Sequence, residues 1–124
     1  MSQHELSMQD KMRIVQELVP GKQITIAHII ANPDDILYRK LGLDPALDYS
    51  RTAIGIVTMS PAETAIIAGD IAIKASGAEL GFVDRFSGTL IVTGTISDVQ
   101  ASLSALVEYC RDVLGFSVCP ITKT

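Results

Sequence analysis

Few side chains in this sequence have the type and spacing that chemistry requires. His28 is the one histidine inside a patterned segment, because His4 lies in a polar N-terminal stretch. A catalytic imidazole needs a partner that orients it, whereas residue alternation places His28 on an apolar strand face. The isoleucines on that face are Ile24, Ile26 and Ile30. The pattern predicts a core or interface histidine.

The remaining reactive residue types are also isolated. Cys110 and Cys119 fall outside any metal or redox spacing, so both are expected to be reduced thiols with packing roles. Asp70 has no second carboxylate three or four residues away, which favours a helix-surface charge. Neither glycine-rich phosphate motif is present. The sequence therefore predicts no enzyme, no cofactor and no metal site.

The segment with the most functional information is the loop Asp84, Arg85, Phe86, Ser87 and Gly88. In a monomer it reads as an ordinary charged β-turn that contains a glycine. In a ring, each of its side chains is repeated around the axis. A loop close to that axis then becomes a pore rim of alternating charge and backbone donors.

Composition restricts the protein classes that fit. The chain has 124 residues, which corresponds to one domain, and carries a net charge of −4. Its basic residues are scattered from Lys11 to Lys123, which argues against nucleic acid as a partner. The longest uncharged run, residues 86–97, is shorter than the roughly 20 residues that span a bilayer. Without a signal-peptide layout, the sequence favours a cytosolic protein.

The first part of the chain contains a tail, two strands and a helix. Residues 1–11 lack apolar periodicity and are expected to form a flexible tail. Met12–Val19 and Gln23–Ile30 read as strands. A short helix is expected to follow Asn32 as its N-cap and to stop at Gly42.

Residues 53–121 have a more regular order. Two segments of the type Ser-x-x-Glu/Gln, Ser60–Glu63 and Ser97–Gln100, resemble capping boxes and are expected to open two helices. The first helix is expected to end near Ser76 and the second at Gly115. The expected strands are residues 53–58, 79–84, 89–95 and 116–121. This β-α-β-β-α-β order predicts an α+β, ferredoxin-like unit with two helices on one face of an antiparallel sheet.

The helix expected over residues 64–75 does not suit a monomer. Its isoleucines occupy more than one side, and alanine and glycine fill most of the rest. A helix that is apolar nearly all round is normally covered all round, but a small domain offers it only one sheet face. We expect a neighbouring subunit to supply the remaining cover.

These segments resemble a bacterial microcompartment shell protein. The resemblance covers residues 12–124, and its most specific segments are VPGKQ, AHIIANP, GFVDRFSG and CPITKT. Because VPGKQITIAHIIANP precedes the core, the sequence is similar to the circularly permuted branch that includes the ethanolamine-utilisation S and propanediol-utilisation U shell proteins. The resemblance implies a homohexamer that tiles the wall of a protein-bounded organelle.

The resemblance also implies roles for individual residues. Asp84–Gly88 corresponds to a loop near the six-fold axis, and Lys74 to a lysine at hexamer edges. One N-terminal strand from each subunit would join a six-stranded barrel over the pore, which leaves no open strand edge. The barrel residues are Met12, Arg13, Ile14, Val15, Gln16, Glu17, Leu18 and Val19.

The expected function is structural, in a shell within the cytoplasm. Expected partners are identical subunits, other shell proteins of the compartment and encapsulated enzymes, whereas nucleic acid and membrane are excluded. The alternative is a ferredoxin-like oligomeric sensor that binds a metabolite between subunits through Asp84, Arg85 and His28. An enzyme that uses Cys110 or Cys119 ranks below both. The sequence leaves open which pathway is enclosed, with choline, ethanolamine and propanediol among the candidates.

Overall fold

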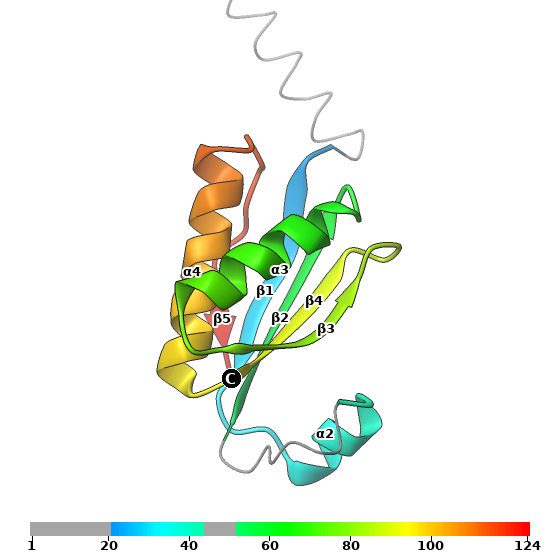
Figure 1. The fold of residues 1–124 in the computed structure, drawn as a ribbon, viewed down its shortest axis with the longest axis vertical. Helices are drawn as coiled ribbons and strands as arrows, with labels where there is room; N and C mark the ends of the chain where they lie inside the picture. The colour runs from blue at the N-terminus through cyan, green and yellow to red at the C-terminus, as the bar shows by residue number, and fades with distance from the viewer. Residues whose placement is uncertain (1–20, 44–51) are drawn as a thin grey trace, which may run out of the picture.

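The computed structural model describes residues 21–43 and 52–124, and these form an α+β fold built on one sheet (Figure 1). The expected tail and the expected barrel strand, residues 1–11 and 12–19, lie outside the described residues. In chain order the elements are β1 (Gln23–Ile30), α2 (Asp35–Lys40), β2 (Ala53–Ser60), α3 (Thr64–Ala75), β3 (Glu79–Asp84), β4 (Thr89–Gly94), α4 (Ile96–Asp112) and β5 (Thr122–Lys123).

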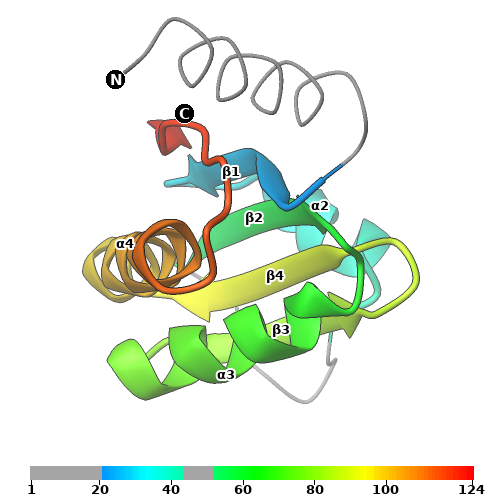
Figure 2. The same ribbon diagram turned by 90° about the horizontal axis from the view of Figure 1, so that it is seen from above.

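The five strands of the described residues form a mixed sheet in the order β3-β4-β2-β1-β5. Three neighbouring pairs are antiparallel, β1 with β2, β2 with β4 and β3 with β4, while β5 runs parallel to β1. Helices α3 and α4 cover one face of the sheet, and α2 lies on the other side (Figure 2). The predicted pair of helices on one sheet face is confirmed, but the predicted all-antiparallel sheet is wrong.

Alternation along the strands divides the apolar side chains into two clusters. On the helix-covered face, residues such as Val57, Leu90 and Leu103 form the main core between the sheet, α3 and α4. On the opposite face, Ile54 and Ile91 pack with Tyr38 of α2 in a smaller cluster. Because neighbouring strand residues point to opposite faces, consecutive positions in β2 and β4 supply both clusters.

The predicted starts of α3 and α4 are both wrong. Strand pairing delays the start of α3, and a different N-cap residue begins α4 earlier. Ser60 is held in β2 opposite Gln23, so the first capping box does not form, and α3 begins only at Thr64. Helix α4 begins earlier than predicted, because the Thr95 hydroxyl accepts a hydrogen bond from the Asp98 amide at 3.1 Å and serves as the N-cap.

The N-cap of α2 also differs from the prediction. Asp34, not Asn32, caps this helix, and its carboxylate accepts a hydrogen bond from the Ile36 amide at 3.1 Å. Tyr38 of α2 donates its hydroxyl to the Thr52 carbonyl, which joins α2 to the residue before β2. The predicted end of the helix is confirmed, since Gly42 follows it with φ of 69°.

The predicted last strand, residues 116–121, is wrong. Only Thr122–Lys123 is a strand, although an isolated bridge pairs Ser117 with Gln23. The edge of β2 that a ferredoxin-like last strand would use is taken by β1 along its whole length. The C-terminal segment therefore runs beside β1, with Phe116 buried at its start.

Register shifts interrupt the alternation of two strands, β1 and β3. The pairing of β1 shifts between Ile24 and Ile26, so Ile24 joins the main core while Ile26 stays half exposed. The pairing of β3 shifts between Leu80 and Phe82, which places these two side chains opposite Val92 and Ile91. Each shift behaves as a β-bulge, which reverses the faces of the residues on either side of it.

Candidate assembly surfaces and the β3–β4 loop

The loop between β3 and β4 is a tight turn closed by its own residues. The Gly88 amide donates to the Asp84 carbonyl at 2.9 Å, and the Asp84 carboxylate accepts from the Phe86 amide at 2.8 Å. The Ser87 hydroxyl donates to the Thr89 hydroxyl at 3.1 Å. These bonds join residues of the turn to one another and to Thr89, the first residue of β4.

Gly88 fastens this turn to the end of β2. Its carbonyl accepts a hydrogen bond from the Met59 amide at 2.9 Å, and its φ is 75°. A Cβ at this position would lie 2.1 Å from the Met59 carbonyl oxygen. Glycine is therefore required here for two reasons: its positive φ, and the close approach of the Met59 backbone.

The charged side chains of the loop have different environments. The backbone hydrogen bond from Phe86, followed by the side-chain bond from Ser87, holds the pKa of Asp84 below its ordinary value. The Arg85 guanidinium lies 4.9 Å from the centre of the Phe86 ring, a cation–π distance. Phe86 is 80% exposed, the largest exposure among the large hydrophobic residues of the described chain.

A hollow of about 370 Å³ lies beside the loop. Its walls come from the loop, from Val83 at the end of β3 and from Ile66 of α3. Arg85 and Phe86 form part of the same wall. The loop and the outer face of α3 are therefore parts of one continuous surface.

Helix α3 buries three of its alanines and exposes three of its four isoleucines, while Ile71 packs against the main core. Ala65, Ala68 and Ala72 have no exposed surface. Ile66, Ile67 and Ile73 are respectively 53%, 48% and 42% exposed. The sequence predicted a helix that needs cover on more than one side, and the described chain covers only the alanine side.

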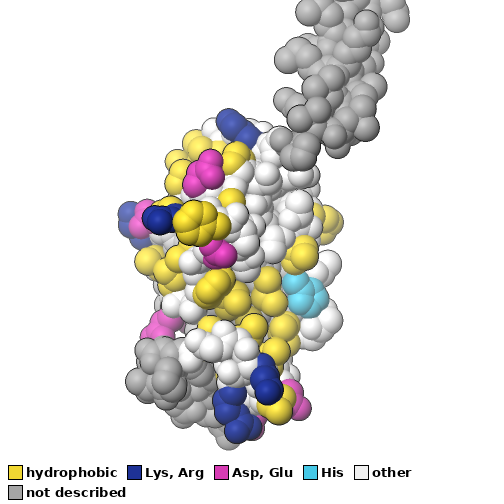
Figure 3. Space-filling view, turned by 90° about the vertical axis from the view of Figure 1, so that its right-hand side faces the viewer, with side chains coloured by type: hydrophobic (Ala, Val, Ile, Leu, Met, Phe, Trp, Pro, Cys, Tyr) yellow, Lys and Arg dark blue, Asp and Glu magenta, His cyan; other side chains and the backbone are white. Residues whose placement is uncertain are grey.

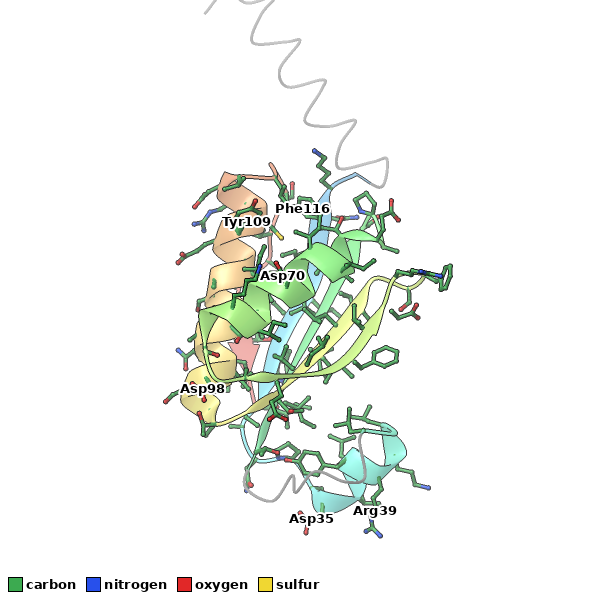
Figure 4. All side chains as sticks on the ribbon, in the orientation of Figure 1. Asp35, Arg39, Asp70, Asp98, Tyr109 and Phe116 are labelled. Carbon is green, nitrogen blue, oxygen red and sulfur yellow. The ribbon has the colours of Figure 1, made fainter. Side chains whose placement is uncertain are left out.

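Asp70 and Lys74 lie on this outer face of α3. The Lys74 ammonium donates to the Asp70 carboxylate at 2.8 Å, and both side chains are more than half exposed. Figure 4 shows Asp70 on the side of α3 that faces the viewer, away from the sheet. This placement confirms Asp70 as a helix-surface charge.

A second apolar surface lies along the edge strand β3. Leu80, Phe82 and Val83 are each about 40% exposed, although they belong to a strand. Figure 3 shows hydrophobic side chains gathered over the middle of this side of the molecule, with charged side chains around them. Monomeric proteins rarely leave large contiguous apolar patches open, so such a patch marks an interaction surface. Simple alternation would place Leu80 and Phe82 on one face of the strand, so the sequence pattern does not predict exposed apolar side chains on both faces of β3.

The structure does not bring the candidate reactive residues together. His28 lies in β1, and its two ring nitrogens contact the hydroxyls of Thr122 and Thr124. Its strand is separated from β3 by β2 and β4, so it does not share a site with Asp84 or Arg85. Thr122 and Thr124 were not singled out from the sequence, where no local pattern links them to His28.

Both cysteines have packing environments. Cys110 is fully buried in the main core, and this burial raises the pKa of its thiol, which disfavours the nucleophilic thiolate. Cys119 lines a groove of about 420 Å³ between α4 and the C-terminal segment.

Within residues 21–43 and 52–124, no cluster of His, Cys, Asp and Glu side chains has a composition that could hold a metal ion. Over the same ranges, none of the helices has the length and hydropathy needed to cross a bilayer.

Comparisons with known proteins agree with the exposed apolar surfaces on α3 and β3, which mark interaction surfaces. The BMC domain family matches residues 53–122. The chain is 47% identical over 115 residues to the bacterial microcompartment shell protein EutS of Escherichia coli (strain K12), covering 93% of this chain and 99% of that protein. It is 50% identical over 112 residues to the bacterial microcompartment shell protein CutR of Streptococcus intermedius, covering 90% and 92% of the two chains.

The fold agrees with a solved structure of the same group. The structure described as the CutR flat hexamer, form 1, superimposes with a TM-score of 0.78 at 48% identity, covering 86% of this chain and 94% of that chain. The matched family and the near full-length relatives lead to one conclusion. This chain belongs to the BMC domain family of bacterial microcompartment shell proteins.

Proposed function

We propose that this protein is a structural shell subunit that assembles as a homohexamer and tiles the wall of a bacterial microcompartment. The observation that carries the proposal is the exposed isoleucine face of α3, which is continuous with the hollow beside the β3–β4 loop. A relative at 48% identity with the same fold is described as a flat hexamer. The relatives of this chain are named as microcompartment shell proteins, so the proposed role is structural and not catalytic.

The strand order supports the proposal that the domain is circularly permuted. Strands β2, β3 and β4, with α3 and α4, follow the order of a ferredoxin-like unit, but β1 occupies the sheet position of its last strand. Strand β1 precedes the unit in the chain and pairs with β2 over eight residues. Moving this strand from the end of the unit to its beginning converts one order into the other.

The β3–β4 loop is proposed to line the centre of the hexamer. Its turn is closed by internal hydrogen bonds and is fastened to β2 at Gly88, so six copies would form a rim of defined shape. Asp84 and Ser87 are engaged within the turn, whereas Arg85 and Phe86 form its outer wall. The rim would then present arginine and aromatic side chains.

The proposed barrel over this centre consists of residues 12–19. They lie outside the described residues, and the proposal rests on the family resemblance and on edge closure. A single N-terminal strand leaves an unpaired edge, but six strands around an axis close on one another. Arg13 and Glu17 would form neighbouring rings of opposite charge.

Lys74 is proposed to lie at the outer edge of the hexamer. Its ammonium is exposed on α3, and its partner Asp70 belongs to the same helix turn, so the lysine is available to a neighbouring hexamer. The protein thus acts in the microcompartment shell, with its own copies, other shell proteins and encapsulated enzymes as proposed partners. The sensor alternative is not favoured, because His28 lies apart from Asp84 and Arg85 in the sheet.

Thin-section electron microscopy of overexpressing cells tests the shell function directly. A shell subunit is expected to form ordered sheets or tubes, whereas evenly dispersed protein would count against the proposal.

The position of the β3–β4 loop is tested by a Phe86→Cys variant treated with a short bis-maleimide. Cross-linked subunit pairs are expected within the hexamer, and a Val113→Cys control at the end of α4 is expected to stay uncross-linked. Equal cross-linking of the two variants would contradict the axial position of the loop.

A further inference from the structure

Two serine hydroxyls join the end of α3 to the start of α4. Ser102 of α4 is fully buried, and its hydroxyl donates to the Ala72 carbonyl of α3 at 2.7 Å. Ser76, the residue that follows α3, donates its hydroxyl to the Asp98 carbonyl of α4 at 2.8 Å. The two serine oxygens lie 2.8 Å apart, and together the two side chains form a serine clamp. Figure 1 shows the end of α3 beside the first turns of α4.

The serine clamp also fixes the turn from α3 into β3. The Ser76 hydroxyl oxygen accepts a hydrogen bond from the Ala78 amide at 3.1 Å. At Gly77, between these two residues, a Cβ would lie 2.9 Å from a carboxylate oxygen of Asp98. The chain therefore leaves α3 in close contact with the first turn of α4.

The clamped residues lie on both sides of Lys74 in the sequence. Ala72 is two residues before Lys74, and Ser76 is two residues after it. The Lys74 side chain is more than half exposed and pairs with Asp70 of the same helix. The clamp thus sets the rotation of the last turn of α3, and with it the position of the Lys74 ammonium.

Apolar packing alone constrains this helix less. Ile71 is the one large side chain of α3 that packs against the main core. The fully buried residues of α3 are small, and they are Thr64, Ala65, Ala68, Gly69 and Ala72. Small side chains interlock less with their neighbours than large ones do, whereas hydrogen bonds depend on direction. A buried polar network whose members are all bonded therefore favours one arrangement of the two helices.

We propose that Ser76 and Ser102 are positioning residues for assembly, which hold the last turn of α3 in the arrangement that a neighbouring hexamer contacts. This inference rests on the proposed place of Lys74 at the hexamer edge. A segment that is ordered before binding loses less conformational freedom on binding, so the association is stronger. Without the clamp, each contact between hexamers would first have to order this turn. Ser102 is fully buried within its own subunit, so its effect on assembly is indirect.

Removing each hydroxyl tests the proposal on purified hexamers. For Ser102→Ala and Ser76→Ala, the lowest protein concentration that gives sheets is measured by sedimentation and negative-stain electron microscopy. We expect this concentration to rise about fivefold in each variant, the scale of one hydrogen bond, while the mass of the hexamer stays unchanged. Ser76→Thr keeps a hydroxyl at this position and should form sheets at the wild-type concentration.

Hydrogen exchange of the Ala78 amide measures the order of the clamped turn directly, because this amide donates to Ser76. In Ser102→Ala its exchange rate should rise about fivefold, since the turn opens more often when one bond of the clamp is lost. This measurement does not require sheets to form.

Two controls separate positioning from a general loss of stability. Ser104→Ala is on the same helix, but Ser104 lines the groove beside the C-terminal segment. Tyr38→Phe removes a hydroxyl bond to the Thr52 carbonyl, far from the clamp on the other side of the sheet. Both controls should form sheets at the wild-type concentration.

Wild-type sheet formation by Ser102→Ala, or an equal loss in Tyr38→Phe, would overturn the inference while leaving the shell function intact. Wild-type hexamers that form no sheets at any concentration would contradict the proposed function, and the inference with it. The two failures are therefore distinguishable.

Discussion

At the scale of single residues, different residues of the β3–β4 loop hold its shape and form its outer surface. Asp84 and Gly88 close the turn, and Gly88 also joins it to β2. Arg85 and Phe86 stack on each other at the surface. In a ring, the shape of the rim and its chemistry would then depend on different residues.

Gly88→Ala should destabilise the protein more than the same replacement at Gly42. An alanine would face both the left-handed backbone and a 2.1 Å approach to the Met59 carbonyl. We expect a loss of more than about 2 kcal/mol. Gly42→Ala is the control, because it has a similar φ but open space around it, and should cost about 1 kcal/mol. Thermal unfolding midpoints measure both, and equal midpoints would refute the close approach.

Asp84 should give the loop an acid-sensitive contribution to stability. Because hydrogen bonds lower the pKa of the native carboxyl, its ionised form stabilises the fold above the ordinary pKa of aspartate, about 3.9. That contribution is lost as the pH falls through the lowered native pKa. Thermal midpoints measured between about pH 6 and pH 3 should fall less steeply for Asp84→Asn than for the wild type. Parallel curves would show that the carboxylate does not stabilise the loop.

At the scale of elements, much of the architecture is predictable and the exceptions have physical causes. The bounds of β1 and β3 agree with the prediction because alternation and flanking turn residues define them. The start of α3 differs from the prediction because Ser60 pairs with Gln23 in the sheet, which no local pattern reports. The bulges in β1 and β3, and the displacement of residues 116–121 by β1, likewise depend on pairing between distant segments.

The candidate site was predictable to a similar extent. The surplus apolar surface of α3 followed from the sequence, because the composition of a helix is readable without its neighbours. The buried side of α3 could not be predicted, because its alanines and its isoleucines are both apolar. In the structure three alanines are buried and three of the four isoleucines are exposed. Pore, barrel and edge positions came from family resemblance and stay predictions.

Replacing the exposed isoleucines of α3 should weaken assembly while leaving the subunit folded. Ile66→Ser combined with Ile67→Ser removes apolar area that is half exposed in the subunit and costs its fold little. Each interface should lose about 2 kcal/mol, enough to dissociate the oligomer on dilution. Analytical ultracentrifugation and circular dichroism report the two properties separately. Val113→Ser, at the exposed residue that follows α4, is the control, and equal effects of the two changes would contradict an interface on α3.

At the scale of the whole molecule, the described chain presents apolar surface on two sides, along α3 and along β3. A subunit that must meet neighbours on more than one side suits a ring within a sheet. The family membership and the hexameric relative agree with this geometry. The proposed function therefore depends on assembly of identical subunits.

Lys74→Ala should leave the hexamer intact and weaken the joining of hexamers into sheets. The exposed Asp70–Lys74 pair contributes less than about 1 kcal/mol to the subunit, so the fold should hardly change. Negative-stain electron microscopy should show fewer and smaller sheets. Lys40→Ala, on exposed α2, should keep the wild-type sheets. Breakdown of the Lys74→Ala protein into subunits would place this lysine inside the ring and not at its edge.

The most direct test of the account is the mass of the purified protein in dilute solution, measured by size-exclusion chromatography with light scattering. The account predicts a single species with about six times the 13.3 kDa mass of one chain. A stable monomer at the same concentrations would contradict it, because the exposed faces of α3 and β3 would then have no partner.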